Sequence, residues 1–214
     1  MYPIDYEADF NPTPNRWTTF FRLILGIPWM IVAAFWLLLF AVTHLIAWIA
    51  VIILGRYPEW AYNFNSGVVR FNVRFYAWLY LQTDVWPPFG LADDPSYPIR
   101  VNVAPRAERQ SRLKALFRII LIIPMYIVTY GVGYLHSGAG IVAWLTIVFR
   151  GYLPEGINSA LTFCNSFYAR VFGYWALLTD DYPPIGIEKG NGSAAIVAAA
   201  PPAPPTEPPP APAA

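Results

Sequence analysis

Two long stretches without a charged side chain dominate the hydropathy pattern. Leu23 to Gly55 holds no Asp, Glu, Lys or Arg in 33 residues, and Ile119 to Phe149 holds none in 31. A straight helix of either length would reach about 45–50 Å, whereas the hydrocarbon core of a bilayer is about 30 Å thick. Each stretch is too long for one ordinary span and short for two. The pattern therefore predicts a hairpin of two short membrane helices, with a turn at "HSGAG", residues 136–140, in the second stretch.

A pattern of helical period follows each apolar stretch, over residues 58–82 and 154–178. In the first copy Trp60, Phe64 and Val68 recur at spacings of four, and the polar side chains lie together on another side. Glu59 and Glu155 stand in the first turn, where the helix dipole favours an acid. We expect one amphipathic helix in each copy, ended by Thr-Asp and a double proline.

Apolar and polar residues alternate in two shorter segments, "YPIDYEADF" at residues 2–10 and "YPIRVNVAP" at residues 97–105. Alternation of this kind is typical of a half-buried strand. A short β-strand is therefore predicted at each segment.

The chain repeats itself with an offset of 96 residues. Aligned without a gap, 23 of the 76 positions from 16 to 91 are identical to those from 112 to 187. This period is much longer than a solenoid repeat and indicates duplication of a whole module. We predict a first module at residues 1–95, a second at 96–187, and a disordered Pro/Ala-rich tail at 188–214.

Composition supports a membrane location. The chain is 57% hydrophobic and only 13% charged, against about 25% charged in a typical soluble domain. Its formal net charge of +1 gives no field that would favour nucleic acid. The first ten residues are acidic and lack a basic segment, so we do not expect a secretory signal peptide.

All fourteen Lys and Arg residues lie outside the predicted hairpin tips. Because cytoplasmic segments carry the Lys/Arg excess, we expect both hairpins to enter from the cytoplasm, with both termini cytoplasmic and the two modules parallel. The fold class is then an all-α membrane protein with two membrane helices and one interfacial helix per module. The alternative, in which the third helix spans, would place Arg70, Arg74 and Arg170 near mid-bilayer, at about 2.5–3.5 kcal/mol each.

The residue types needed for catalysis or metal binding are sparse. His44 and His136 do not align between the repeats, the lone Cys164 has no cysteine partner, and no phosphate-binding loop or nucleophile elbow appears. We expect no catalytic residue, no metal and no cofactor.

Charged residues, most of which recur in both copies, are the better candidates for a binding role. Arginines are predicted to hold anionic lipid headgroups or a partner's carboxylates: Arg22, Arg70, Arg74, Arg118 and Arg170. Acids are predicted to fix helix ends by pairing: Glu59, Asp84, Glu155 and Asp180. A purely structural role for the arginines, with their side chains extended to the headgroups, is the alternative.

Several of the duplicated motifs resemble a bacterial membrane-protein family catalogued as a domain of unknown function. They are "RLILGIP" at residues 22–28, "GRYP" at 55–58, "VRFYAWLYLQTDVWPPFGL" at 73–91, and the second copies "RIILIIP" at 118–124 and "YARVFGYWALLTDDYPPIGI" at 168–187. The resemblance implies a multi-spanning membrane domain and carries no activity.

The expected function is that of a non-enzymatic scaffold or accessory subunit in a bacterial plasma membrane. Its expected partners are membrane lipids with anionic headgroups and either a membrane protein or further copies of this chain. A small-solute transporter or channel between the two modules is the alternative, and an enzyme acting on lipid headgroups is a weaker one.

Overall fold

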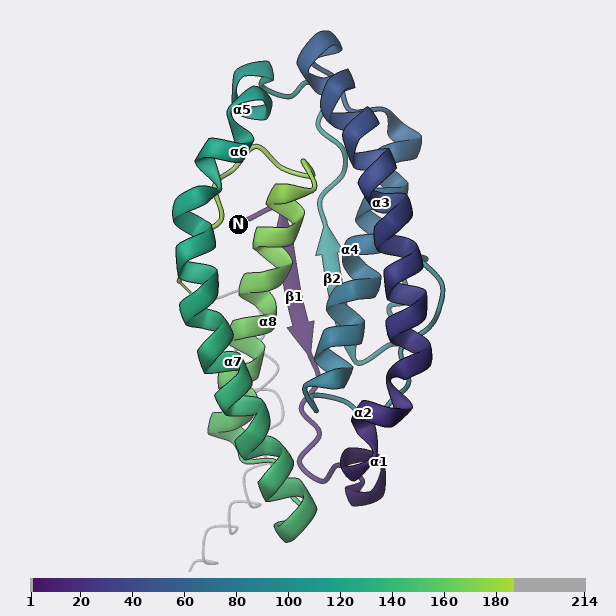
Figure 1. Cartoon of the computed structure of the whole chain (residues 1–214), viewed down its shortest axis with the longest axis vertical. Coiled ribbons are helices and arrows are strands. Elements are labelled where there is room, and N and C mark those ends of the chain that lie inside the picture. Colours follow the sequence, from purple (N-terminus) through teal and green to yellow (C-terminus); the bar gives the residue numbers. More distant parts are fainter. Residues whose placement is uncertain (1, 187–214) are drawn as a thin grey trace, which may run out of the picture.

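The structure, a computed structural model, describes residues 2–186 and is mostly helical (Figure 1). The predicted tail at 188–214 lies outside the described residues. The first repeat contains β1 (Ile4–Ala8), α1 (Arg16–Phe20), α2 (Arg22–Leu25), α3 (Ile27–Leu54) and α4 (Glu59–Leu79). The second contains β2 (Ile99–Val103), α5 (Arg112–Leu116), α6 (Arg118–Leu121), α7 (Ile123–Arg150) and α8 (Glu155–Trp175). The same order in both copies agrees with a duplicated module, and the two predicted strands are present.

Each long apolar stretch forms one continuous helix, so the predicted hairpins are wrong. Both α3 and α7 are 28 residues long and end at glycines in the left-handed conformation, Gly55 with φ 67° and Gly151 with φ 80°. The predicted turn at 136–140 lies inside α7, where Gly140 provides room for the ring of Tyr80. Gly140 thus serves packing against Tyr80 rather than chain reversal.

The two repeats are related by a pseudo-twofold axis that runs across the long helices. β1 pairs antiparallel with β2, in the symmetric register Ile4↔Val103, Tyr6↔Val101 and Ala8↔Ile99. α1 packs against α7, and α5 packs reciprocally against α3. Figure 1 shows α3 and α7 running in opposite directions along the long dimension of the molecule. The chain therefore forms two long antiparallel helices, one from each repeat, in place of two helical hairpins.

The elements form three layers. Phe71, Phe75 and Trp78 of α4 pack against α3, whereas Tyr62, on the opposite side of α4, donates to the carbonyl of Ala104 just after β2. Arg74 of α4 reaches the carbonyl of Ile99 in β2. In α8, Phe167 likewise packs with residues of α7, and Gly173 lies against Ile4 of β1. α4 and α8 thus form a middle layer, with α3 and α7 on one side and the two-stranded sheet on the other.

The third helix of each module is a core helix, which corrects the prediction of a surface helix. Fourteen of the 21 residues of α4 are buried. Polar side chains of α4 form hydrogen bonds inside the molecule: Thr43 of α3 donates to Asn65 Oδ1 at 2.6 Å, and Asn65 donates to the Tyr57 hydroxyl at 2.7 Å. The amphipathic pattern reflected one side packed on α3 and another hydrogen-bonded within the protein, because buried polar groups need partners.

Gln82, just after α4, joins β1 and α8 through hydrogen bonds. Tyr6 of β1 donates to Gln82 Oε1 at 2.6 Å, and Gln82 Nε2 donates to Thr162 of α8 at 2.8 Å. Asn165 also donates to Gln82 Oε1. A satisfied polar network of this kind fixes how the strand, the end of α4 and α8 meet.

Candidate functional site

The outer sides of α3 and α7 form an extended apolar surface, which we call the apolar face. Leu38, near the middle of α3, is 67% exposed, and Tyr134, its counterpart on α7, is 79% exposed. Large exposed side chains of α3 include Ile27, Met30, Ile31, Phe35, Leu37, Leu38, Leu39, Val42, Leu45, Ile46, Ile49, Ile53 and Leu54. On α7 they include Ile123, Tyr126, Ile127, Tyr130, Tyr134, Leu135, Ile141, Val142, Leu145 and Phe149. An exposed apolar area this large marks an interaction surface.

The opposite side of the molecule, the sheet face, is charged. Ile4, Tyr6, Ile99 and Val101 are buried, so the residues that alternate with them point away from the helices. These outward residues are Asp5, Glu7, Arg100 and Asn102. Arg100 pairs with Glu7 at 3.2 Å and with Asp9 at 2.7 Å, and hydrogen bonds to Asp9 raise its pKa.

Arg22 and Asp84 hold the first helical turns to the end of α4. The Arg22 side chain is buried and donates from Nη1 to the carbonyls of Trp78 and Thr83, and from Nη2 to Asp84. Asp84 also accepts from the backbone N–H of Asn15, the N-cap of α1, at 2.7 Å.

The second copy repeats this arrangement. Arg118 donates to the carbonyls of Tyr174 and Thr179 at 2.7 and 2.8 Å and to Asp180 at 3.0 Å, and Asp180 accepts from the N-cap Ser111. We call each pair an Arg–Asp clamp. The predicted pairing role of Asp84 and Asp180 is thus observed, and the guanidinium groups of both clamps bind groups of this chain.

Two further candidate arginines, Arg74 and Arg170, are turned toward the protein as well, whereas Arg70 is half-buried and its Nε has no hydrogen-bond partner within residues 2–186. Arg74 is buried and binds the carbonyls of Ile99 and Ala92 and the carboxylate of Asp93. Burial lowers the pKa of Arg74, and Asp93 acts in the opposite direction. Arg170 donates to Ser166 and to the carbonyl of Gly186. The structure does not bring these arginines together into one pocket.

Glu59 and Glu155 stand in the first turn of α4 and α8, as predicted. Both are exposed. Their position near the positive end of the helix dipole is favourable.

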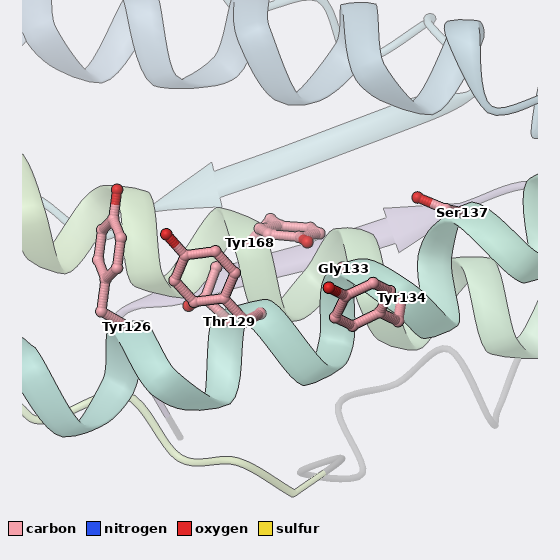
Figure 2. A pocket seen from close by; sticks show the side chains of 7 residues that line it. Tyr126, Thr129, Gly133, Tyr134, Ser137 and Tyr168 are labelled. Atoms are coloured by element: carbon pink, nitrogen blue, oxygen red, sulfur yellow. The ribbon is translucent and has the colours of Figure 1, made fainter.

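Sequence reasoning missed a groove lined by hydroxyl groups on α7. Figure 2 shows Tyr126, Tyr134 and Ser137 projecting from α7 beside Tyr168 of α8. The groove has a volume of about 410 Å³, and Gly133 leaves space for the Tyr168 hydroxyl. The spacing of Tyr126, Tyr130 and Tyr134 by four residues was the available signal.

A second cavity of about 450 Å³ lies between α3, α6 and the end of α8. Its walls are mainly aromatic and aliphatic, with Phe40, Trp48 and Trp175 among them, and it includes the polar side chains of His44 and Arg118. Pockets of this size and character are suited to apolar ligands with few polar groups.

The histidines and the cysteine are far from forming a metal centre. His136 stacks on Tyr80 at 3.6 Å between ring centroids, His44 stacks on Phe40 at 5.2 Å, and Cys164 is a buried free thiol. Within residues 2–186 no group of three His, Cys, Asp or Glu side chains is placed to hold a metal ion.

These features define a duplicated, mostly helical protein with two long exposed helices, each long and apolar enough to cross a membrane by length and composition. A family model matches residues 16–90 and 112–185, one segment per repeat. The chain belongs to that family, DUF4389, described as a domain of unknown function. Comparison with curated proteins and with solved structures found no match.

Proposed function

We propose that this protein is a membrane scaffold or accessory subunit that lies flat in one leaflet of a bacterial plasma membrane. The single observation that carries the proposal is the contrast between its two sides. The apolar face of α3 and α7 enters the hydrocarbon, and the charged sheet face stays in water. A helix in the interface plane buries its apolar side to a depth of about 5–10 Å.

A spanning orientation is less favourable because of where the sheet lies. The pseudo-twofold axis passes through the strand pair, so β1 and β2 lie level with the central parts of α3 and α7 along the long dimension of the molecule (Figure 1). If these helices crossed the bilayer, Glu7 and Arg100 would lie near its centre. An ionisable side chain there costs about 2.5–3.5 kcal/mol on insertion scales.

In the flat orientation the pseudo-twofold axis stands along the membrane normal, so both modules insert the same way round. The basic side chains at the ends of the long helices then reach the headgroup level. Arg56, Arg112 and Arg150 are exposed there, and Arg112 also lies against the C-terminal Gly55 of α3. These positions favour anionic headgroups, because Lys and Arg near an anionic surface contribute about 1 kcal/mol each. The water-facing sheet is free to contact a protein partner or a second copy.

Depth measurement along α3 tests the orientation. Ile31, Leu38 and Leu45 are exposed at seven-residue spacing on one side of the helix. Each would be changed to cysteine in a Cys164→Ala background and labelled with bimane, and quenching by lipids brominated at known depths would be measured. We expect the same shallow depth at all three positions.

A depth profile that is greatest at Leu38 and falls toward both Ile31 and Leu45 would show a spanning helix and overturn the flat orientation. It would favour the alternative of a transporter or channel. Asn102→Cys on the sheet face serves as the control, since its label should not be quenched by any brominated lipid.

A further inference from the structure

Trp175 and Leu177, which line the second cavity, are the neighbours of Ala176, and the first repeat has a tyrosine at the position of this alanine. Tyr80 and Ala176 occupy equivalent positions and each forms the C-cap of its helix, α4 and α8. The next residues, Leu81 and Leu177, share a left-handed backbone with φ of 69° and 62°. The chain therefore has the same course at both sites, and the difference between them lies in the side chains.

In the first of these sites, the ring of Tyr80 fills the space. It stacks on His136 with ring centroids 3.6 Å apart and planes 17° from parallel. It also occupies the place that a side chain at residue 140 would take, because an added Cβ on Gly140 would stand 2.9 Å from Tyr80 Cδ1. At this position the protein itself supplies a phenol ring, that of Tyr80.

In the second site, Ala176 supplies no ring, and Phe40 and His44 replace His136 and Gly140. Both line the open cavity of about 450 Å³. The imidazole of His44 takes up part of the space, stacked 11° from parallel on Phe40, and its Nδ1 is buried without a hydrogen-bond partner among residues 2–186. A buried polar atom without a partner costs free energy unless a ligand satisfies it.

The cavity opens on the apolar face. Ala41, Leu45 and Ile119 line it and are exposed. Trp48 and Trp175 provide further flat walls. The buried Nε of Arg118 also lacks a partner within the described part of the chain, but Arg22 has the same feature beside the filled site. That feature belongs to the Arg–Asp clamps. At the filled site, Nε2 of His136 is also buried without a partner among the described residues, but the Tyr80 ring covers that imidazole, whereas His44 lines an open cavity.

We propose that this cavity binds the ring of a membrane-soluble quinone or phenol, whose hydrocarbon tail remains in the lipid. The ring takes the place that Tyr80 holds in the other half, and an oxygen substituent hydrogen-bonds to His44. The inference rests on the proposed function, because the ligand enters from the bilayer through the apolar face.

Binding of 2-decyl-1,4-benzoquinone by the purified full chain in detergent micelles tests the inference. Isothermal titration calorimetry should show saturable binding at one site. The double variant His44→Gly with Ala176→Tyr copies the filled site and should weaken binding by about tenfold or more, as expected when a ring-sized cavity is closed. The reverse pair, Gly140→His with Tyr80→Ala, opens the equivalent space and should add a second site.

A second variant tests the contribution of the oxygen substituent separately from that of the ring. His44→Leu keeps the volume and removes the polar partner, so the quinone should then bind no better than decylbenzene, whereas the native chain should prefer the quinone. Equal binding of the quinone by the native and the filled protein would overturn the inference, as would a native preference for decanoate or for decylbenzene.

Vesicle flotation distinguishes this inference from the proposed function. The filled variant should still bind vesicles of phosphatidylethanolamine and phosphatidylglycerol. Loss of quinone binding with retained flotation supports both proposals, and quinone binding that survives filling refutes only the ligand site.

Discussion

At the scale of single residues, the two Arg–Asp clamps explain why the same arginine and aspartate recur in both repeats. Arg22 and Arg118 each donate to two main-chain carbonyls, one in the last turn of the core helix and one in the segment that follows it. A charged side chain is suited to this role because hydrogen bonds from an ionised donor are stronger than neutral ones.

Arg22→Met should therefore destabilise the protein by about 3–5 kcal/mol, since it leaves Asp84 without its cationic partner and the carbonyl of Thr83 without its donor. Chemical unfolding in detergent micelles, followed by tryptophan fluorescence, measures this loss. Arg118→Met should have a similar effect, and Arg150→Met, at an exposed position, should change the stability little. A negligible effect of Arg22→Met would show that the clamp contributes nothing to the fold.

At the scale of elements, the glycines of α7 distinguish a continuous helix from a hairpin. An added Cβ on Gly138 would meet nothing within 4 Å, whereas one on Gly140 would meet the ring of Tyr80. Gly138→Ala should stabilise the protein by about 1 kcal/mol, the propensity difference between alanine and glycine inside a helix.

The Gly140→Ala variant gains the same helix propensity, but its new methyl group displaces the Tyr80 ring. The Gly140→Ala protein should therefore be less stable than the Gly138→Ala protein. Thermal unfolding of the two variants under identical detergent conditions provides the comparison. Destabilisation by Gly138→Ala would be the behaviour of a turn and would argue against the continuous α7.

At the scale of the whole molecule, the polarity of the two sides should decide how the protein binds a bilayer. Leu38→Asp places a charge in the centre of the apolar face and removes a leucine whose burial contributes about 1.5–3 kcal/mol. We expect vesicle flotation to show partitioning reduced by about tenfold or more.

Asn102→Asp introduces the same charge on the sheet face and is the matched control, because this side chain is exposed in β2. Its partitioning should remain close to that of the native chain. An equal loss for both variants would mean that the apolar face has no special part in membrane binding.

The duplication, the two short strands, and the limits of the third helices within a few residues could all be predicted from the amino-acid sequence. These features follow from local pattern: identity at a fixed offset, alternation, helical period, and the placement of Pro and Gly. The three-dimensional structure was needed to show that α3 and α7 are unbroken and antiparallel, that the amphipathic helices are central, and that Tyr80 fills the space beside His136. The physical reason is that an apolar or amphipathic pattern shows that a helix has a side to bury but does not show against what. The partner, whether α4, the sheet or lipid, is set by contacts between residues that are distant in the chain.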